Sequence, residues 1–550
     1  MTKQKMFKFI FANLAMGSFA IANAEAIKTK PLGSPDAKMG TTLYVNLGVE
    51  PGSLHPLKSN EAASSEVQGY ILDSLAIRNV DTYEWEPALS TGWETAADGK
   101  SYTFKIRQGV KWSDGKPFTA EDVKFSFEAI FDPKMEAAAL IPYFEAIEKA
   151  EIVDASTVKF TVKEKYFKNF EVVAGLTVIP KHIYGNPANK SNLNKTLIGT
   201  GPYSLEKWEQ GQRITLKRNP GYWGWGTPDY AGKYNFEKMV MRFVKEQNVS
   251  FEMLKKGDID YDAFTPETYV QRAVGPEWGT KVFKVKTKNN APKGYGFVAW
   301  NLKDVKFQDK KVRKALAHLM NRAEMIKKFR FDMSEPATGP WYKYSIYSSD
   351  KVKSIDFDPK LALKLLAEAG WKDSDKNGIV DKMIDGKKVE MSFTVMTANP
   401  DFEKYLTMYK EDAKQAGVNV EVKKAEWNSF IKQLDERNFE AVNLGWGAGS
   451  VDLDPKQIWH SESSKGTGSN FIAYSNKEVD SLIDQARGTL DKNARIPLLK
   501  KVYEIIADDA PYVFLFNDSN TLYGHTAHMK RSKDTFGFGV GYDYWWSLKN

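Results

Sequence analysis

The chain of 550 residues is 42% hydrophobic and carries a formal net charge of +8 at pH 7. This length exceeds what one hydrophobic core usually serves, so two to four domains are expected. Basic and acidic residues are interspersed without a long run of one sign, and no nucleic-acid-binding motif is present, which argues against a nucleic-acid partner. The sequence has no cysteine, which excludes disulfide bonds and a cysteine-linked lipid anchor.

The first 24 residues have the features of a secretory signal peptide. Lys3, Lys5 and Lys8 precede an apolar run at 9–22, and Ala22-Asn23-Ala24 forms a small-x-small cleavage site. The alternative, a membrane anchor, is disfavoured because the run is too short to cross a bilayer, and no later stretch is long enough either. Cleavage would remove three lysines and lower the net charge from +8 to +5. We therefore expect the mature protein in a bacterial periplasm, without a lipid.

The N-terminal part of the mature chain mixes predicted strands and helices. Residues 40–49 alternate apolar and polar side chains, which predicts a strand, and a helix is predicted at about 64–75. A half-buried strand is predicted at 102–106. Thr119 is then placed to cap a helix, with Asp122 at the position that completes a capping box.

The segment from Tyr83 to Pro133 resembles the best-known motif of the family 5 extracellular solute-binding proteins, which are the oligopeptide- and dipeptide-binding proteins of ABC importers. The motif reads P-x-L-A-x-x-W, then D-G-K-x-Y-x-F-x-L-R-x-G-V-x-W-x-D-G-x-P-F-T-A-x-D-V. A match of this length is specific. The matching residues are Pro87, Leu89, Trp93, Asp98, Gly99, Phe104, Arg107, Gly109, Val110, Trp112, Asp114, Gly115, Pro117, Phe118, Thr119, Ala120, Asp122 and Val123.

The resemblance continues along the mature chain. Beyond the first motif, the patterns predict a helix capped by Asp358 that ends at Gly370, a helix over 405–417 and a strand over 418–422. Two helices and then a strand at 512–516 are predicted near the C-terminus. The stretches that resemble the family lie at 179–185, 198–208, 214–224, 255–262 and 300–326.

This resemblance implies an α/β fold, namely a two-lobed periplasmic binding protein of type II, cluster C, with an extra inserted subdomain. The inserted subdomain is expected over 76–189 and lobe II over 298–516, with crossover strands near 298–301 and 513–517 at the hinge. Ligand would bind between the lobes, which close on it and exclude water. Lobe I is expected to be discontinuous, with residues 40–75, 190–297 and 517–550.

The stretch Phe439–Ser461 is the main candidate for ligand contact. An apolar run at 441–444 predicts a buried strand. Glycines let a ligand approach the backbone, tryptophan supplies a broad contact face, and a carboxylate holds a cation. The alternative is an ordinary loop after a core strand. The candidate residues are Gly445, Trp446, Gly447 and Asp452.

The resemblance implies further contacts. Peptide-binding relatives have a second cleft tryptophan 19 residues before the loop tryptophan, a position held here by Trp427. The alternative for each tryptophan is a place in the core. The N-terminal loop of these relatives contacts an extended peptide through its backbone. The corresponding residues here are Asn60, Glu61 and Ala62.

The chain departs from these relatives at Gly449. Relatives that bind the α-ammonium of a peptide have an aspartate there, three residues after the loop tryptophan. The loop is also longer before its proline, so a shifted loop would bring Asp452 to the same place. An ion pair in a closed cleft would be a large specificity term, and its absence would suggest a ligand without a free amine.

A separate loop has part of a calcium-binding pattern. Asp373, Asp375, Asn377 and Asp381 occupy positions 1, 3, 5 and 9 of such a loop. Position 12 is Ile384 and not the usual glutamate, so the ligand set is incomplete and the alternative is a polar turn. No cofactor other than this candidate calcium ion is expected.

The sequence thus predicts a monomeric periplasmic protein that binds an oligopeptide-like solute and delivers it to an inner-membrane ABC permease without catalysis. Alternatives within this transport role are an oligosaccharide, a metal chelate or a haem-like molecule, since two tryptophans also suit a sugar ring. An alternative of another class, a secreted hydrolase, would need two convergent carboxylates. The sequence contains no G-x-S-x-G, H-E-x-x-H or P-loop pattern.

Overall fold

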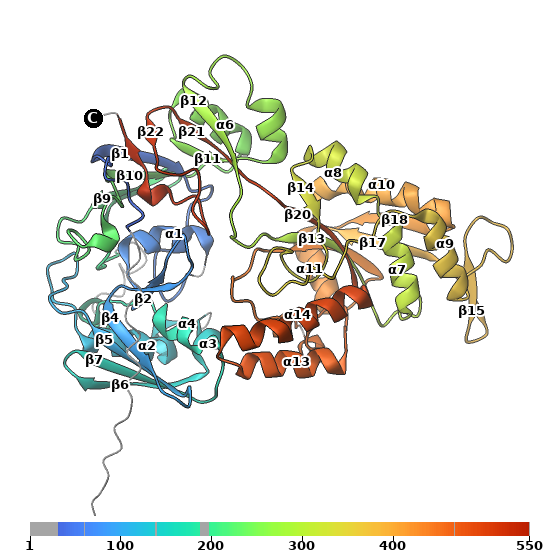
Figure 1. The fold of residues 1–550 in the computed structure, drawn as a ribbon, viewed down its shortest axis with the longest axis horizontal. Helices are drawn as coiled ribbons and strands as arrows, with labels where there is room; N and C mark the ends of the chain where they lie inside the picture. Colours follow the sequence, from blue (N-terminus) through green and yellow to red (C-terminus); the bar gives the residue numbers. More distant parts are fainter. Residues whose placement is uncertain (1–30, 60, 138–139, 187–196, 467, 549–550) are drawn as a thin grey trace, which may run out of the picture.

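The computed structural model describes residues 31–59, 61–137, 140–186, 197–466 and 468–548, so the predicted signal peptide and Asn60 lie outside the described residues. Three larger sheets organise the chain, each packed against its own hydrophobic core. Figure 1 shows two bodies, with the seven-stranded and four-stranded sheets in one and the six-stranded sheet in the other. Within the described part of the chain, no helix is long and apolar enough to cross a membrane.

The seven-stranded sheet draws on distant parts of the chain. Its strand β1 pairs in parallel with β10 and β11, while the C-terminal strand β21 pairs antiparallel with β11 and β12. Helix α1 (Ala62–Ile71) buries Val67 and Ile71 in the core of this sheet, and α6 (Gln247–Lys256) belongs to the same body. The strand order is β12 (Val282–Thr287), β21 (Thr521–Thr526), β11 (Tyr261–Ala263), β1 (Gly40–Asn46), β10 (Phe236–Arg242), β9 (Arg213–Arg218) and β8 (Tyr203–Glu209).

The four-stranded sheet forms the inserted unit of the same body. Helix α2 (Ala120–Phe131) packs on it, and the backbone N–H of Thr119 donates to the Asp122 carboxylate at 2.9 Å, which confirms the predicted capping box. Hairpin β2–β3 (Ala76–Arg78 and Trp85–Pro87) joins this unit to the larger sheet. The remaining elements are β4 (Ser90–Thr95), β5 (Ser101–Ile106), β7 (Thr157–Val162), β6 (Ile147–Asp154), α3 (Ile141–Phe144), α4 (Asn169–Ala174) and α5 (Lys181–Tyr184).

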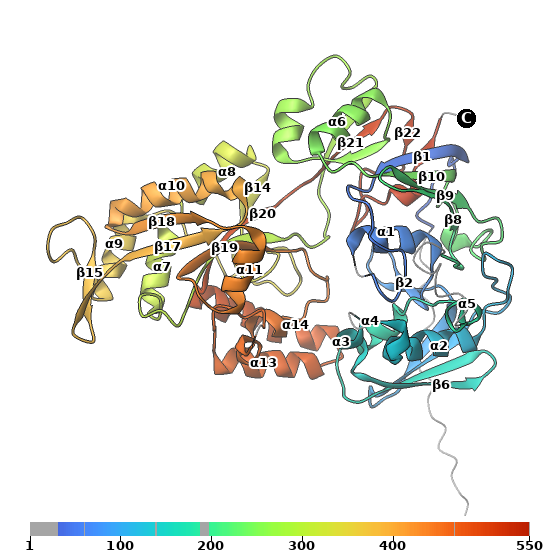
Figure 2. The same cartoon turned by 180° about the vertical axis from the view of Figure 1, so that it is seen from behind.

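The six-stranded sheet is covered by helices on both faces, as the two views show (Figures 1 and 2). Its central strand β13 is antiparallel to both β20 and β19, and β19 contains the strand predicted at 441–444 in the candidate ligand-contact stretch. The strand order is β14 (Ser334–Pro336), β20 (Tyr512–Asp518), β13 (Tyr295–Trp300), β19 (Ala441–Trp446), β17 (Ser392–Thr397) and β18 (Asn419–Lys424). The helices are α7 (Lys310–His318), α8 (Arg322–Arg330), α9 (Pro359–Glu368), α10 (Glu403–Ala413), α11 (Trp427–Asp435), α12 (Lys456–Trp459), α13 (Lys477–Gly488) and α14 (Lys492–Asp509).

The chain passes between the two bodies at residues 288–294, from β12 to β13, and at Ser519 and Asn520, from β20 to β21. The crossover strands expected at 298–301 and 513–517 are therefore inside the six-stranded sheet, and the connections adjoin them. The strand residues of the three sheets fall in the predicted lobes, except that β13 and β20 extend past the predicted boundaries at 297 and 517. Those boundaries stay predictions.

The first connection is tightly packed where it meets the ligand loop. Tyr295 is paired with Trp446 in the ladder between β13 and β19. A Cβ atom on the preceding residue, Gly294, would lie 2.6 Å from the carbonyl oxygen of Trp446 and 3.3 Å from the carbonyl carbon of Gly447. Because backbone atoms cannot move aside as a flexible side chain can, only glycine fits at position 294 without displacing the loop.

The substitution Gly294→Ala should therefore lower the thermal unfolding midpoint. The free energy of unfolding should fall by about 1–3 kcal/mol, as at other overpacked sites. Circular dichroism during heating measures this. Gly447→Ala is the matched control, because a Cβ there meets nothing within 4 Å. Equal midpoints for the two variants would contradict the steric argument.

Candidate functional site

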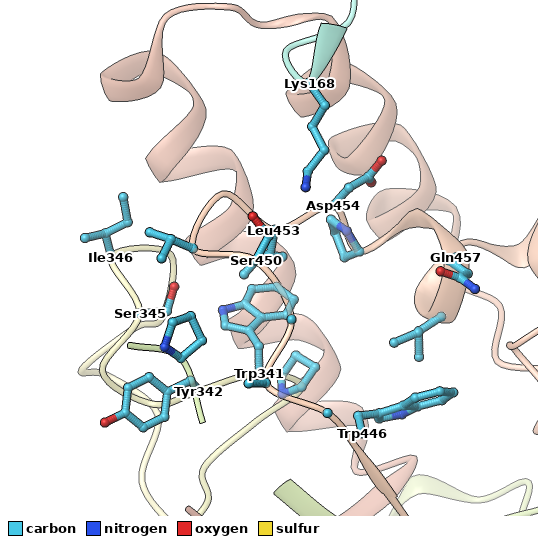
Figure 3. A pocket seen from close by; sticks show the side chains of 18 of the residues that line it. Lys168, Trp341, Tyr342, Ser345, Ile346, Trp446, Ser450, Leu453, Asp454 and Gln457 are labelled. Carbon is cyan, nitrogen blue, oxygen red and sulfur yellow. The ribbon is translucent and has the colours of Figure 1, made fainter. Parts of the chain in front are cut away.

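A cavity of about 900 Å³ lies between the two bodies. Its walls come from the loop after β19, the loop at 340–346, the connection at 290–295, and the inserted unit, which contributes Tyr166 and Lys168. Figure 3 shows Trp341, Trp446, Asp454 and Lys168 around this space. The volume is near the upper end of the usual range for small-molecule pockets.

The loop after β19 lines the cavity with both a ring and exposed backbone. The Trp446 ring stacks on Phe297 at 5.9 Å between centroids and lies 6.0 Å from Phe471, so it forms part of the wall. The following residues, 447–450, also line the cavity. Among the described residues, no hydrogen-bond partner is found for the backbone N–H groups of 447–450.

A second aromatic wall was missed by the sequence reasoning. Trp341 lines the cavity with only 8% of its surface exposed, and its ring meets Tyr503 edge-on at 5.2 Å. In the part of the chain that the structure describes, neither the Trp341 Nε1–H nor the buried Ser450 hydroxyl has a hydrogen-bond partner. The signal available in the sequence was the run Gly339-Pro340-Trp341-Tyr342, a turn followed at once by large aromatic residues.

Asp452 does not present a free carboxylate to the cavity. It lies 3.2 Å from the Arg78 guanidinium of the other body and 3.6 Å from that of Arg495, and it accepts a hydrogen bond from the Tyr347 hydroxyl at 2.9 Å. Burial and the Asp452 charge raise the pKa of Tyr347 to about 12, so its hydroxyl remains a donor. The expected replacement for the aspartate missing at Gly449 is thus already held in an ion-pair network.

Arg78 is fixed by its own body as well. Its guanidinium carbon lies 4.4 Å from the ring centroid of Tyr83 and 4.1 Å from that of Trp85. It also donates to the Tyr83 carbonyl oxygen at 2.8 Å. These contacts orient the guanidinium at the end of β2, toward Asp452 across the gap between the bodies.

Asp454 makes a second contact between the bodies. It accepts a hydrogen bond from the Tyr166 hydroxyl at 2.7 Å and forms an ion pair with Arg487. The Arg487 guanidinium carbon lies 4.2 Å from the Tyr166 ring centroid, and that of Arg495 lies 4.1 Å from the Phe167 ring centroid. Burial and the adjacent Asp454 charge both raise the pKa of Tyr166. We call these contacts, with the Arg78–Asp452 pair, the interbody bridge.

The other predicted site residues lie outside the cavity. Gly445 is paired with Gly296 in the β13–β19 ladder. Trp427 begins α11, is 54% exposed and stacks on Phe430 at 6.0 Å between centroids. Glu61 precedes α1 at the N-cap position, without a side-chain capping hydrogen bond, and accepts a hydrogen bond from the backbone N–H of Gly52 at 2.8 Å, with Ala62 exposed beside it. Trp446 and Gly447 do line the cavity, and ligand contact by any of these residues stays a prediction.

The predicted calcium ligands come together only in part. Carboxylate oxygens of Asp373, Asp375 and Asp381 lie within 4.8 Å of one another. The Asp381 oxygens accept hydrogen bonds from Ser374 at 2.7–2.9 Å, and Asp375 pairs with Lys388. Asn377 directs its amide nitrogen at Glu390, at 2.9 Å. The carboxylates are thus used within a polar turn, and calcium binding stays a prediction.

Comparisons with known proteins agree with this architecture. The family described as "Bacterial extracellular solute-binding proteins, family 5 Middle" matches residues 84–468. The oligopeptide-binding protein AppA of Bacillus subtilis (strain 168) is 29% identical over 558 residues, covering 98% of this chain and 97% of that protein. The oligopeptide-binding protein OppA of the same organism is 27% identical, covering 88% and 90%.

The comparison with solved structures also finds a solute-binding protein of this kind. The solved structure of AppA from Bacillus subtilis in complex with a nonapeptide has a TM-score of 0.71 and 26% identity, covering 93% of this chain and 100% of that one. The predicted two-lobed α/β fold is confirmed. Because the family match spans most of the chain, this protein belongs to the family 5 bacterial extracellular solute-binding proteins.

Proposed function

We propose that this protein captures an oligopeptide-like solute in the cavity between its lobes and delivers it to an inner-membrane ABC permease. The observation that carries the peptide class is the exposed backbone at 447–450, whose N–H groups lack partners among the described residues. An extended peptide offers carbonyl oxygens to such a run, and backbone pairing binds many sequences at one site. The relatives named for oligopeptides support the same class.

The aromatic walls suit side chains of varied shape. The aromatic residues that line the cavity give broad apolar faces, which can contact ligand side chains of different shapes. They are Trp341, Tyr342 and Trp446. The buried Nε1–H of Trp341, which has no partner among the described residues, would supply one directed donor to a ligand carbonyl oxygen that reaches it. The mechanism is reversible capture: the lobes close over the solute, exclude water, and make or break no covalent bond.

The remaining parts of the proposal concern location and partners. The N-terminal segment with its lysines, apolar run and Ala-Asn-Ala site supports export through a cleavable signal peptide to the periplasm. Membership of this family supports docking of the closed form on an ABC permease. The protein acts as a monomer in this scheme, because each chain supplies both lobes of the cavity.

Native mass spectrometry of the exported protein, purified from its own periplasm, tests the ligand class. We expect a ladder of heterogeneous peptide masses that are released on denaturation. A single sugar, metal chelate or other non-peptide mass would overturn the peptide assignment and leave the family assignment standing.

The substitution Trp341→Phe keeps an aromatic ring and removes only the donor. One hydrogen bond contributes about 0.5–1.5 kcal/mol, so calorimetry should show a loss of peptide affinity of roughly 2- to 12-fold. Trp208→Phe is the control, because Trp208 donates to Glu50 at 2.8 Å on the surface of lobe I, outside the cavity. An equal loss in both variants would contradict the role of Trp341.

The substitution Arg78→Met should weaken closure, since it removes the interbody pair and leaves Asp452 with Arg495 and Tyr347 in its own lobe. Hydrogen bonds to charged groups contribute about 1.5–3 kcal/mol, which predicts a fall in ligand affinity of roughly 10- to 100-fold. Small-angle X-ray scattering should also show a larger radius of gyration with ligand present.

The control for this prediction is Arg213→Met. Arg213 pairs with Glu209 at 2.5 Å within the seven-stranded sheet and bridges nothing between the lobes. Its loss should leave affinity and compactness unchanged. If Arg78→Met behaves in the same way, the interbody bridge does not govern closure.

A further inference from the structure

Basic side chains outnumber acidic ones around the cavity. Among the described residues, five basic and two acidic side chains line it, and one of the basic ones, Lys456, is paired with Glu462 and Asp484 outside the lining. One of the acids, Asp454, is neutralised by Arg487. The other, Glu145, is exposed to solvent, where an ion pair contributes little. The basic residues are Lys168, Lys293, Lys456, Arg487 and Lys492.

Two of these lysines lack a carboxylate partner. Among the described residues, no carboxylate lies within 4 Å of the Nζ atom of Lys293 or of Lys492. Lys293 donates instead to the Thr521 hydroxyl at 2.9 Å and to the Asn289 amide oxygen at 3.3 Å. Burial lowers the pKa of the Lys293 ammonium, and the charge of Asp518 offsets this shift only in part.

A third lysine is only weakly paired. The Nζ atom of Lys168 lies 3.6 Å from Glu171, beyond hydrogen-bond distance, and Glu171 also faces Arg78 at 3.5 Å. Figure 3 shows Lys168 extending from the inserted subdomain toward Asp454, so the lysine reaches the cavity from the wall opposite lobe II. Lys168 and Lys293 therefore bring positive charge from two different segments.

The carboxylates that could have held a cationic ligand group are both consumed. Asp452 is shared by Arg78, Arg495 and Tyr347, and Asp454 by Arg487 and Tyr166. Gly449, on the cavity wall, has a positive φ of 68° and no side chain. In the described part of the cavity wall, a ligand ammonium would meet lysines without a close carboxylate, and it would find no free buried carboxylate.

We infer that the cavity selects anionic oligopeptides, through Lys168 and Lys293, and does not anchor the α-ammonium of its ligand. This inference rests on the proposed function, since it specifies the charge of the peptide that the same cavity takes. The carboxylates of the ligand, whether terminal or on side chains, supply the negative charge that the lysines lack in the protein. In the water-excluded cleft this attraction is stronger than at the surface.

Calorimetry with two matched pentapeptides tests the inference. The probes are Ala-Glu-Ala-Glu-Ala and Ala-Lys-Ala-Lys-Ala, each with a free or an acetylated N-terminus. We expect the glutamate peptide to bind at least 10-fold more tightly than the lysine peptide, and acetylation to change its affinity by less than 3-fold. A lysine peptide that binds equally well, or a loss above 10-fold on acetylation, overturns the inference and leaves the proposed function intact. If none of the four peptides binds, the proposed function is contradicted, and the inference that rests on it is contradicted as well.

Substitutions of the two lysines test whether they cause the preference for the glutamate peptide. Lys168→Met with Lys293→Met should reduce the preference for the glutamate peptide to less than 3-fold, and an undiminished preference would refute the assignment. Lys387→Met is the control for net charge, because Lys387 is exposed on β16 (Lys387–Glu390), away from the cavity. It should leave the preference unchanged.

A gain-of-charge variant gives an independent reading. In Gly449→Asp the new Cβ meets nothing within 4 Å, and aspartate tolerates positive φ better than most residues. It places a carboxylate on the cavity wall without removing any contact. The variant should bind the free-amine lysine peptide at least 5-fold more tightly than the wild-type protein does, and acetylation should abolish this gain. No gain would argue against the missing carboxylate as the cause of selectivity.

Discussion

Two aspartates in the loop after β19 hold the two bodies of this protein together. Asp452 and Asp454 are each removed from water and must be paired, because an unpaired buried charge costs several kcal/mol. Each finds an arginine within lobe II, Arg495 or Arg487, and a donor across the gap, Arg78 or Tyr166. The carboxylates are fully compensated only when the bodies meet. The bridge therefore stabilises the closed arrangement and fixes where the cavity forms.

Because the two aspartates are paired in this way, neither offers a free carboxylate to a ligand in the cavity. A carboxylate shared between two arginines cannot also neutralise a ligand cation without losing one of them, and charge-assisted hydrogen bonds of this kind are among the strongest in proteins. What remains for the ligand is the exposed backbone of 447–450, the aromatic walls, and lysines without full compensation. In the proposed mechanism, closure and specificity thus draw on one short segment of the chain, whose acids pair across the gap and whose backbone faces the ligand.

The sequence predicted local structure well and the site only in part. The capping box at Thr119, the helix opened by Asp358 and the strand after residue 440 depend on neighbours a few residues apart, and such signals are readable locally. The family motif then supplied the two-lobed fold. The partners of the two aspartates could not be read in this way. Asp452 meets Arg78 across 374 positions, and Asp454 meets Tyr166 across 288. No periodicity connects residues so far apart.

The two tryptophans Trp427 and Trp341 also show what local sequence does not determine. The resemblance to peptide-binding relatives implied a cleft residue at Trp427, and ligand contact by Trp427 stays a prediction, because position along the chain does not fix the direction of a side chain at the start of a helix. In the structure Trp427 lies exposed against Phe430, while Trp341, which had no spacing argument, lines the cavity. A proline-aromatic run in a loop is a weak signal, because aromatic residues more often serve the core.

Since Asp454, Arg487 and Tyr166 both line the cavity and bridge the lobes, ligand binding and closure are thermodynamically linked. The apparent affinity for any solute is its intrinsic affinity multiplied by the fraction of protein that can close. A change confined to the bridge alters that fraction and shifts the affinity for all solutes by a common factor. In our proposal, a change confined to Lys168 alters the intrinsic term and shifts acidic and basic solutes in opposite directions. The ratio of two affinities is therefore independent of closure and reports the difference between their intrinsic affinities, to which the charge of the cavity contributes.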